Sequence, residues 1–383
     1  MDKPTVQDIF HRFYPAYLDQ YSPSPVQAKV AHNIMNCKTG AYGANVCVCE
    51  DCGFVQIHYN SCRNRCCPMC QAVPKEMWMD ARREDVLDAP YFHLVFTVPD
   101  ILNPVIYSNQ RLLYDALYHA ASSTISELTA DPKHLGAKVG YICILHTWGS
   151  EMNFHPHIHT ILLGGGLASN NQWKDNGENF FLTIRVISKV FRGKYLEELK
   201  RLWEEDKLVF QGTAEKFRNH YTFKELLDSC YGMDWIPHCK KTFNGAQTVI
   251  KYLGKYTHRI AVSNHRIVRM DDDTVTFLVK DYRNEGQWKE LTISGVEFVR
   301  RFLMHVPPRR FVRIRHYGLL CSRTKNQKLT LCRNLLGCKK YLSKLRDMEM
   351  PEILEHLYGI KVCVCKACGG HLGKPQMRMP LRC

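Results

Sequence analysis

The hydrophobic residues of this chain follow two periods, one typical of helices and one typical of strands. Residues 111–129 place apolar side chains every three to four positions, which predicts a helix. Residues 91–99 are β-branched and aromatic and end at Pro99, which predicts a strand. The same criteria predict helices at residues 6–17, 25–36, 75–87, 188–205, 214–227 and 245–258. They predict strands at residues 140–148, 155–163 and 181–186 and a hairpin within residues 259–279.

Helices and antiparallel strands intermix along the chain without a repeating strand–helix unit, so we expect the α+β class. The 383 residues exceed the roughly 100 to 200 residues of a typical domain, which predicts two or more domains. We expect the boundaries after residues 88, 265 and 346, which gives the segments 1–88, 89–265, 266–346 and 347–383.

Positive charge is concentrated in one part of the chain. Lys and Arg number 52 against 37 Asp and Glu, a net charge of +15. Between Arg300 and Arg346 there are 14 basic residues and no acidic ones, so the rest of the chain is nearly neutral. Aromatic residues are interleaved with these bases, as in surfaces that follow a phosphate backbone. The segment therefore favours nucleic-acid binding over a solvated basic face. The candidate DNA-binding residues are Arg300, Arg301, Arg309, Arg310, Arg313 and Arg315.

A membrane partner is not expected. No stretch approaches the ~20 apolar residues that a spanning helix needs, and the first ten residues lack the apolar segment of a secretory signal. We therefore expect a cytoplasmic protein, in which closely spaced thiols bind metal more often than they form disulfides.

The 18 cysteines include pairs with the spacing of zinc knuckles. Cys49-x-x-Cys52 and Cys67-x-x-Cys70 are separated by 14 residues, which predicts one tetrahedral zinc held by all four thiolates. Four thiolates leave no open coordination position, so this zinc is expected to be structural.

Other cysteines offer further metal sites. Three lie in the same segment and could form a second zinc site with one histidine; the candidates are Cys37, Cys62, Cys66, His32 and His58. Near the C-terminus, Cys365-x-x-Cys368 resembles half a knuckle that Cys363 and Cys383 could complete.

Two motifs carry candidate chemistry. His155, His157 and His159 alternate in a predicted strand, so their side chains point to one face and invite a metal ion. Tyr252 and Tyr256 are four residues apart in a predicted helix and share a face, a spacing that is also common in helix cores. Together the motifs suggest that a phenol attacks a phosphodiester polarised by a metal ion. The phosphotyrosine bond that results would store the energy for rejoining.

These motifs lie in longer strings that resemble a known family. His157-Ile158-His159 matches the His-hydrophobic-His motif of the HUH endonucleases. Nearly the whole chain resembles the two-tyrosine rolling-circle transposases of the bacterial insertion sequence ninety-one family. The strings are NSCRNRCCPMCQ (60–71), HTWGSEMNFHPHIHTILLGGG (146–166), YLGKYTHRIAVSNHRI (252–267) and EFVRRFLMHVPPRRFVRIRHYGLL (297–320). Where the family is expected to have a histidine, this chain has Cys66, which can also bind zinc.

The resemblance implies an activity and its residues. It implies a single-strand DNA endonuclease and strand transferase that nicks and rejoins transposon ends. Tyr252 and Tyr256 would be the nucleophiles, and His157 and His159 would bind Mg²⁺ or Mn²⁺. The third cation ligand would be Gln247 or His155. Gln247 is preferred because three histidines favour zinc or manganese over magnesium.

The resemblance also implies the architecture and the partners. An HUH-type antiparallel sheet with flanking helices would occupy residues 89–265, after a small zinc-binding domain at 1–88. A hairpin and basic DNA-binding region would follow at 266–346, and then a cysteine-rich tail. The expected partners are single-stranded transposon ends and target DNA in the bacterial cytoplasm, associated with the nucleoid, and a homodimer is left open.

Three other functions fit some of the same residues. Rolling-circle replication initiators and relaxases share the cation and tyrosine chemistry, but the zinc domain and the basic region favour a transposase. A non-enzymatic, zinc-stabilised DNA-binding regulator would use the histidines and tyrosines structurally. A zinc hydrolase built on the three histidines would lack a carboxylate base beside them.

Overall fold

A six-stranded sheet forms the centre of the molecule in the computed structural model, which describes residues 3–176, 182–235, 238–243, 249, 254, 261–281 and 285–378. The strand order is β11-β4-β5-β3-β7, with β6 paired to β5, and every pairing is antiparallel. The strands are β3 (Tyr91–Thr97), β4 (Lys138–Trp148), β5 (Phe154–Leu167), β6 (Trp173–Asp175), β7 (His238–Phe243) and β11 (Ile314–Gly318). The expected α+β class is therefore confirmed.

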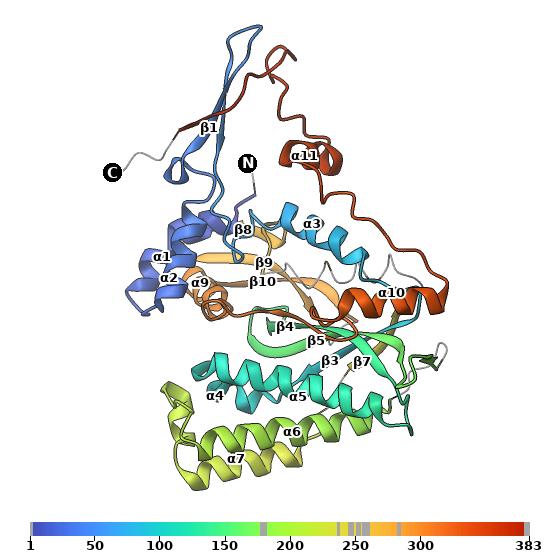
Figure 1. Cartoon of the computed structure of the whole chain (residues 1–383). Coiled ribbons are helices and arrows are strands. Elements are labelled where there is room, and N and C mark those ends of the chain that lie inside the picture. The colour runs from blue at the N-terminus through green and yellow to red at the C-terminus, as the bar shows by residue number, and fades with distance from the viewer. Residues whose placement is uncertain are drawn as a thin grey trace.

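One face of this sheet is covered by helices (Figure 1). They are α4 (Asn103–Ser108), α5 (Gln110–Ala130), α6 (Ile184–Glu204) and α7 (His220–Gly232). Ile158 and Leu162 of β5 are buried in the core that these helices form with the sheet. Because side chains alternate along a strand, His157 and His159 of β5 point to the opposite face. The helices therefore leave the histidine face to other parts of the chain.

A second core joins the start of the chain to its later part. Helices α1 (Val6–Leu18) and α2 (Pro25–Met35) pack with α9 (Gly295–Met304) and with a sheet of β8 (Ile267–Met270), β9 (Thr274–Asp281) and β10 (Gln287–Ser294). The rings of Phe10 and Phe302 meet edge to face at 5.2 Å. Both first helices begin with reciprocal caps, Thr5 with Asp8 and Ser24 with Gln27. This core joins residues that the predicted boundaries place in different domains.

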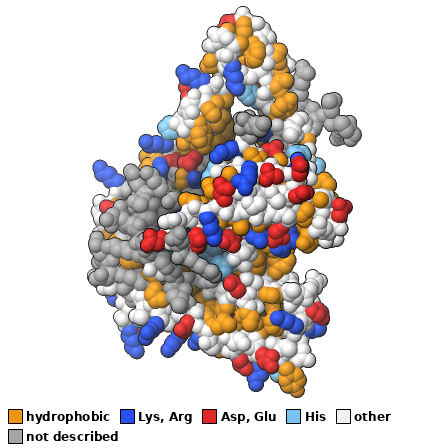
Figure 2. Space-filling view, turned by 180° about the vertical axis from the view of Figure 1, so that it is seen from behind, with side chains coloured by type: hydrophobic (Ala, Val, Ile, Leu, Met, Phe, Trp, Pro, Cys, Tyr) orange, Lys and Arg blue, Asp and Glu red, His pale blue; other side chains and the backbone are white. Residues whose placement is uncertain are grey.

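A narrow three-stranded ribbon projects from the rest of the molecule (Figure 1). It consists of β1 (Ala44–Val48), β2 (Val55–Tyr59) and, from the far end of the chain, β12 (Gln376–Arg378). Asn45 of β1 is paired with both His58 and Met377. Figure 2, which views the molecule from behind, shows hydrophobic side chains on this projecting part. The exposed ones include Val48, Val55, Ile57 and Tyr59.

A long segment, residues 321–362, connects the central sheet to the ribbon, and we call it the strap. It contains α10 (Lys325–Leu336) and α11 (Met350–Tyr358) and crosses α3 (Ala72–Arg83). The carboxylate of Asp80 in α3 accepts hydrogen bonds from the Tyr341 and Ser343 hydroxyls, both at 2.6 Å, and from the Leu345 amide at 2.9 Å. Eight of the 14 basic residues between Arg300 and Arg346 thus lie in the strap, which hydrogen bonds to this carboxylate hold against α3.

Most of the elements expected from hydrophobic periodicity occur close to their predicted bounds. One exception is the helix predicted at residues 214–227, which is divided into a 3₁₀ turn at Gly212–Phe217 and α7 from His220. Another is residues 181–186, predicted as a strand, because α6 begins at Ile184. Its β-branched first turn continues into the buried Ile187, Phe191 and Tyr195, whose spacing is helical, so packing on the sheet decides for a helix. The helix expected at 245–258 lies largely outside the described residues. Short 3₁₀ turns occur at Gly40–Tyr42, Asp100–Leu102, Gly212–Phe217 and Asn264–Arg266, and no described helix is both long and apolar enough to cross a membrane.

Candidate functional site

Three histidines meet on the face of the central sheet away from the helices. His157 and His159 come from β5, and His146 comes from the neighbouring β4, where it is paired with His157. One ring nitrogen of each lies within 4.8 Å of those of the other two, and the Nε2 atoms of His157 and His159 are 3.0 Å apart. All three side chains are buried. We call this group the histidine triad.

Neighbouring groups orient two rings of the triad. Nδ1 of His157 lies 2.6 Å from the carbonyl oxygen of His155. Because a carbonyl can only accept, Nδ1 carries the proton and the lone pair of Nε2 points to the centre of the triad. Nδ1 of His159 lies 2.8 Å from Nε2 of His93, which holds that ring in a similar way. The ring of His146 stacks on Trp148 at a centroid distance of 4.5 Å.

The triad is suited to a divalent cation. Burial lowers the pKa of His157 to about 4, although the hydrogen bond to His155 opposes the shift, so this imidazole is neutral near pH 7 and can donate its lone pair. Three imidazoles leave coordination positions open for water or substrate, as in catalytic sites. Imidazole ligands suit Mn²⁺ or Zn²⁺ better than Mg²⁺, which prefers oxygen ligands.

Neither candidate for the third ligand is part of the triad among the described residues. His155 has Nδ1 at 3.1 Å from Oδ1 of Asp100, and its side chain is 32% exposed. It lies at the start of β5, where the pairing with β4 shifts register, so it does not join the other two histidines despite its alternation with them. Gln247 lies outside the described residues. His146 was missed, although Ile142, Ile144 and His146 alternate in a strand that a short hairpin pairs with β5.

The predicted nucleophiles, Tyr252 and Tyr256, also lie outside the described residues. The described residues nearest to them in sequence are Val249 and Gly254. Val249 is buried in a cluster that includes Ile144 and Ile161, which are on the histidine face of the sheet. Gly254 lies against α3, so closely that an added Cβ would be 2.0 Å from Sδ of Met79. Because Met79 belongs to the same cluster as Val249, both of these described residues lie on the side of the sheet that carries the triad.

A first cysteine cluster lies at the base of the ribbon and consists of Cys37, Cys62, Cys67 and Cys70. The Sγ of Cys70 is 3.3 Å from that of Cys37 and 3.6 Å from that of Cys62. Four sulfurs around one zinc, with Zn–S bonds of ~2.3 Å, would be about 3.8 Å from one another. The backbone amides of Cys62 and Asn64 point at the sulfurs of Cys37 and Cys62, which favours thiolates. The donor set and spacing fit zinc.

The prediction of one zinc shared by Cys49, Cys52, Cys67 and Cys70 is wrong in its grouping. Cys49 and Cys52 lie in the turn of hairpin β1–β2, at the far end of the ribbon (Figure 1). There they meet a pair from the C-terminal part of the chain, and the second cysteine cluster is Cys49, Cys52, Cys365 and Cys368. The spacing along the chain correctly identified each pair of cysteines, but the hairpin separates the two pairs in space, so each pair joins other cysteines.

The other candidates for a second zinc site do not join a cysteine cluster. Cys66 is buried, and this raises the pKa of its thiol, which the neighbouring Arg313 partly opposes. His32 contacts Asn36, and His58 lies 2.7 Å from the Gln56 amide. Of the five residues proposed for that site, the structure brings only Cys37 and Cys62 into a cluster.

Most of the arginines predicted to bind DNA make contacts within the protein. Arg300 and Arg301 form ion pairs with Glu297 at 2.6 and 2.7 Å. Arg315 is paired with Asp115 and stacks on Tyr118, 4.0 Å from the ring centre. Arg313 lies over the ring of Trp148. The exposed members of the set are Arg309 and Arg310.

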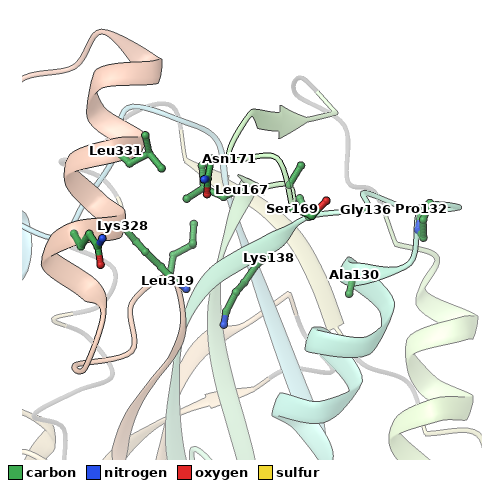
Figure 3. A pocket seen from close by; sticks show the side chains of 13 residues that line it. Ala130, Pro132, Gly136, Lys138, Leu167, Ser169, Asn171, Leu319, Lys328 and Leu331 are labelled. Carbon is green, nitrogen blue, oxygen red and sulfur yellow. The ribbon is translucent and has the colours of Figure 1, made fainter.

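A pocket of about 770 Å³ lies at the other end of β4 and β5 from the triad (Figure 3). Its walls come from the end of α5, from α10 and from the chain near Lys138 and Leu167. Burial and the neighbouring Lys138 lower the pKa of Lys328, which also lines it. None of the triad histidines lines this pocket, so it is distinct from the candidate active site.

Comparison with known sequence families gives two matches. Residues 9–98 match the family described as "Transposase zinc-binding domain". Residues 140–328 match the family Y2_Tnp, described as "Putative transposase". The first range contains the complete first cysteine cluster, and the second contains the histidine triad.

Individual relatives agree with these matches. The protein is 40% identical to "Putative transposase y4qJ" of Sinorhizobium fredii (strain NBRC 101917 / NGR234), over 95% of this chain and 93% of that one. It is 29% identical to "Transposase for insertion sequence element IS801" of Pseudomonas savastanoi pv. phaseolicola, over 79% of this chain and 72% of the relative. Among solved structures, the conjugative relaxase TrwC in complex with oriT DNA matches 67% of this chain and 96% of its own, with 14% identity and a TM-score of 0.26.

Proposed function

The chain belongs to the insertion sequence ninety-one (IS91) family of two-tyrosine transposases with an N-terminal zinc-binding domain, and we propose that it nicks and rejoins single-stranded transposon ends through a phosphotyrosine intermediate. The observation that carries this proposal is the histidine triad. Its three imidazoles are buried, converge on one point and, for His157 and His159, are oriented by polar neighbours.

The proposed cation ligands are His146, His157 and His159. When bound, a divalent cation there would polarise the scissile phosphate and stabilise charge on the leaving oxygen. The hydrogen bond from His157 to the His155 carbonyl keeps Nε2 aimed at the centre, and burial of the His157 ring lowers its pKa and keeps it neutral. This donor set favours Mn²⁺ over the Mg²⁺ that was equally expected from the sequence.

Tyr252 and Tyr256 are the proposed nucleophiles. The phenol oxygen of one would form a bond to phosphorus while the bond from phosphorus to the 3′ oxygen breaks, and the phenol proton ends on that oxygen. The product is a 5′-phosphotyrosine and a free 3′ hydroxyl, which reverses the same exchange when strands are rejoined. The contacts of Val249 with the histidine face and of Gly254 with α3 support a tyrosine segment near the triad.

The first cysteine cluster is the proposed zinc site of the zinc-binding domain. All four of its cysteines lie within the matched range 9–98, and their spacing fits four thiolate ligands. For DNA binding, we propose that Arg309 and Arg310 contact the phosphate backbone, because they are the exposed arginines of the predicted set.

The decisive experiment is capture of a covalent protein–DNA adduct. The full chain is incubated with labelled single-stranded oligonucleotides from candidate element ends in Mn²⁺ or Mg²⁺, and adducts are resolved under denaturing conditions. We expect an adduct that disappears in the double variant Tyr252→Phe with Tyr256→Phe. The matched control is Tyr221→Phe, because Tyr221 is 76% exposed and lies on α7, on the other side of the sheet.

Two outcomes would contradict the proposal. One is the absence of an adduct with every end sequence, although the folded protein binds the oligonucleotides. The other is an adduct that persists in the double tyrosine variant. Loss of the adduct in His146→Ala, with retained oligonucleotide binding, would separate the role of the triad from that of the DNA-binding surface.

A further inference from the structure

The sequence contains one short motif twice, near its two ends. Residues 47–53 read CVCEDCG, and residues 363–369 read CVCKACG. In each copy the last two cysteines have the spacing of a zinc knuckle and are followed by glycine. The copies are more than 300 residues apart in sequence, and the structure brings them face to face at the far end of the ribbon.

The two copies have the same local geometry. Gly53 and Gly369 have positive φ angles of 72° and 77°. Their amides donate to the carbonyl oxygens of Cys49 and Cys365 at 3.0 and 2.9 Å. Glycine adopts this conformation without strain, and the resulting turn directs both thiols of a knuckle to one side. Each copy therefore presents two sulfurs in the same way.

The sulfurs of the two knuckles lie at distances that fit one zinc ion. The Sγ atoms of Cys49 and Cys368 are 3.5 Å apart, and those of Cys52 and Cys365 are 3.8 Å apart. These values are close to the ~3.8 Å expected for sulfurs around tetrahedral zinc and far above the ~2.05 Å of a disulfide bond. The backbone amides of Ala367 and Gly370 point at the sulfurs of Cys365 and Cys368, both at 3.4 Å.

Backbone pairing locks the knuckles together around this cluster. The amide of Glu50 donates to the carbonyl of His371 at 3.1 Å, and that of Gly373 donates to the carbonyl of Val48 at 2.9 Å. The side chain of Asp51 accepts from the amide of His371 at 3.2 Å. The backbone is thus already arranged for four thiolates to meet, which lowers the cost of ordering the site when metal binds.

We propose that Cys49, Cys52, Cys365 and Cys368 bind a second structural zinc ion, which clasps the C-terminal part of the chain to the N-terminal zinc-binding domain. Cys365 and Cys368 lie outside both matched ranges, 9–98 and 140–328. The first cysteine cluster is complete without them, so the second cluster is a separate site. Cys47 and Cys363, the first cysteines of the two copies, are not ligands.

The second cysteine cluster, which we call the clasp, is one of several contacts that connect the strap to earlier parts of the chain. The strap leaves the central sheet after β11, crosses α3 through the Asp80 contacts and reaches the clasp at Cys365. Beyond the clasp, β12 adds to the ribbon beside β1. Zinc bound by the second cysteine cluster would therefore fix the far end of the strap and order β12, whereas the Asp80 contacts would hold the middle of the strap without it.

Zinc stoichiometry of the full chain tests the proposal. Native mass spectrometry should show that Cys365→Ser with Cys368→Ser lowers the zinc content by one ion per chain. The control Cys363→Ser changes an exposed cysteine next to the cluster and should keep the full content. Limited proteolysis should then cut the double variant, but not the control, within or beyond α11. An unchanged zinc content in the double variant would overturn the proposal.

A measurement on the unaltered protein covers the case in which the double variant does not fold. Titration of the thiols with a mercurial should release two zinc ions in total as the eight cluster cysteines react, and X-ray absorption should show four sulfur ligands per zinc at ~2.3 Å. Release of a single tetrathiolate zinc would overturn the proposal. The proposal would also be overturned if the mass of the denatured protein were lower than that of the fully reduced chain by four hydrogens, the number lost when two disulfide bonds form.

Discussion

Glu297 offers a quantitative test of how the basic segment is used. It lies in the first turn of α9, and its carboxylate accepts hydrogen bonds from Arg300 at 2.6 and 2.8 Å and from Arg301 at 2.7 Å. The hydrogen bonds from Arg300, opposed by partial burial and aided by Arg301, lower the pKa of Glu297 to about 2. Two arginines predicted to contact DNA thus stabilise the core that α9 forms with α1.

The size of this contribution follows from the shift. A fall in pKa from 4.5 to about 2 corresponds to ~3.4 kcal/mol at ~1.36 kcal/mol per unit. The Glu297 side chain is 27% exposed, so solvent screening reduces the contribution to the order of 2 kcal/mol. Because the folded pKa is the lower one, the stabilisation is fully present above pH 4.5 and is lost as the pH falls towards 2.

The change Glu297→Gln should therefore lower the free energy of unfolding of the α9 core by about 2 kcal/mol at pH 7. Between pH 5 and pH 3 the wild type should lose stability faster than the variant, which lacks the titrating group. Urea denaturation with hydrogen exchange measured on α9 gives both quantities, and Glu225→Gln, at an exposed position of α7, is the matched control. An equal pH dependence in Glu297→Gln and wild type would refute the reasoning.

Three further predictions test the site and the fold. His146→Ala should weaken Mn²⁺ binding, measured by calorimetry, by about 100-fold or more, whereas His155→Ala should leave it nearly unchanged; equal effects would contradict the triad. Asp80→Asn should raise the rate of hydrogen exchange in the strap about 30- to 100-fold, because hydrogen bonds to a charged carboxylate contribute ~2 kcal/mol or more. The control Asp88→Asn changes an exposed carboxylate and should leave the rate unchanged. Equal exchange rates in the two variants would contradict the anchoring role of Asp80. Gly318→Ala should lower the free energy of unfolding by about 3 kcal/mol, because φ is +62° and an added Cβ would be 1.8 Å from the Val139 carbonyl oxygen. A thermal melt like that of the wild type would contradict this close approach of Gly318 to the Val139 carbonyl.

Local patterns predicted most of the elements near the site. The long, mostly apolar runs of β4 and β5 reflect burial of both faces of the sheet. The strand predicted at residues 181–186 was wrong because a short β-branched run is also compatible with the start of a helix. The contact of Phe191 with Phe96 in the core favours the helix. The alternation of His155 with His157 and His159 did not place it in the triad, because period-two alternation does not show where a strand ends or where its register shifts.

The sequence by itself determined the residue types and their local spacing: knuckle pairs of cysteines, a His-x-His strand and a basic segment in the last third of the chain. These depend on residues a few positions apart, whose relative placement is set by strand period and turn geometry. Only the tertiary structure decided which groups complete one another. His146 reaches His157 through strand pairing, Cys49 reaches Cys368 from more than 300 residues away, and Arg315 pairs with Asp115. Such long-range partners follow from how sheets and helices pack, which no local spacing encodes.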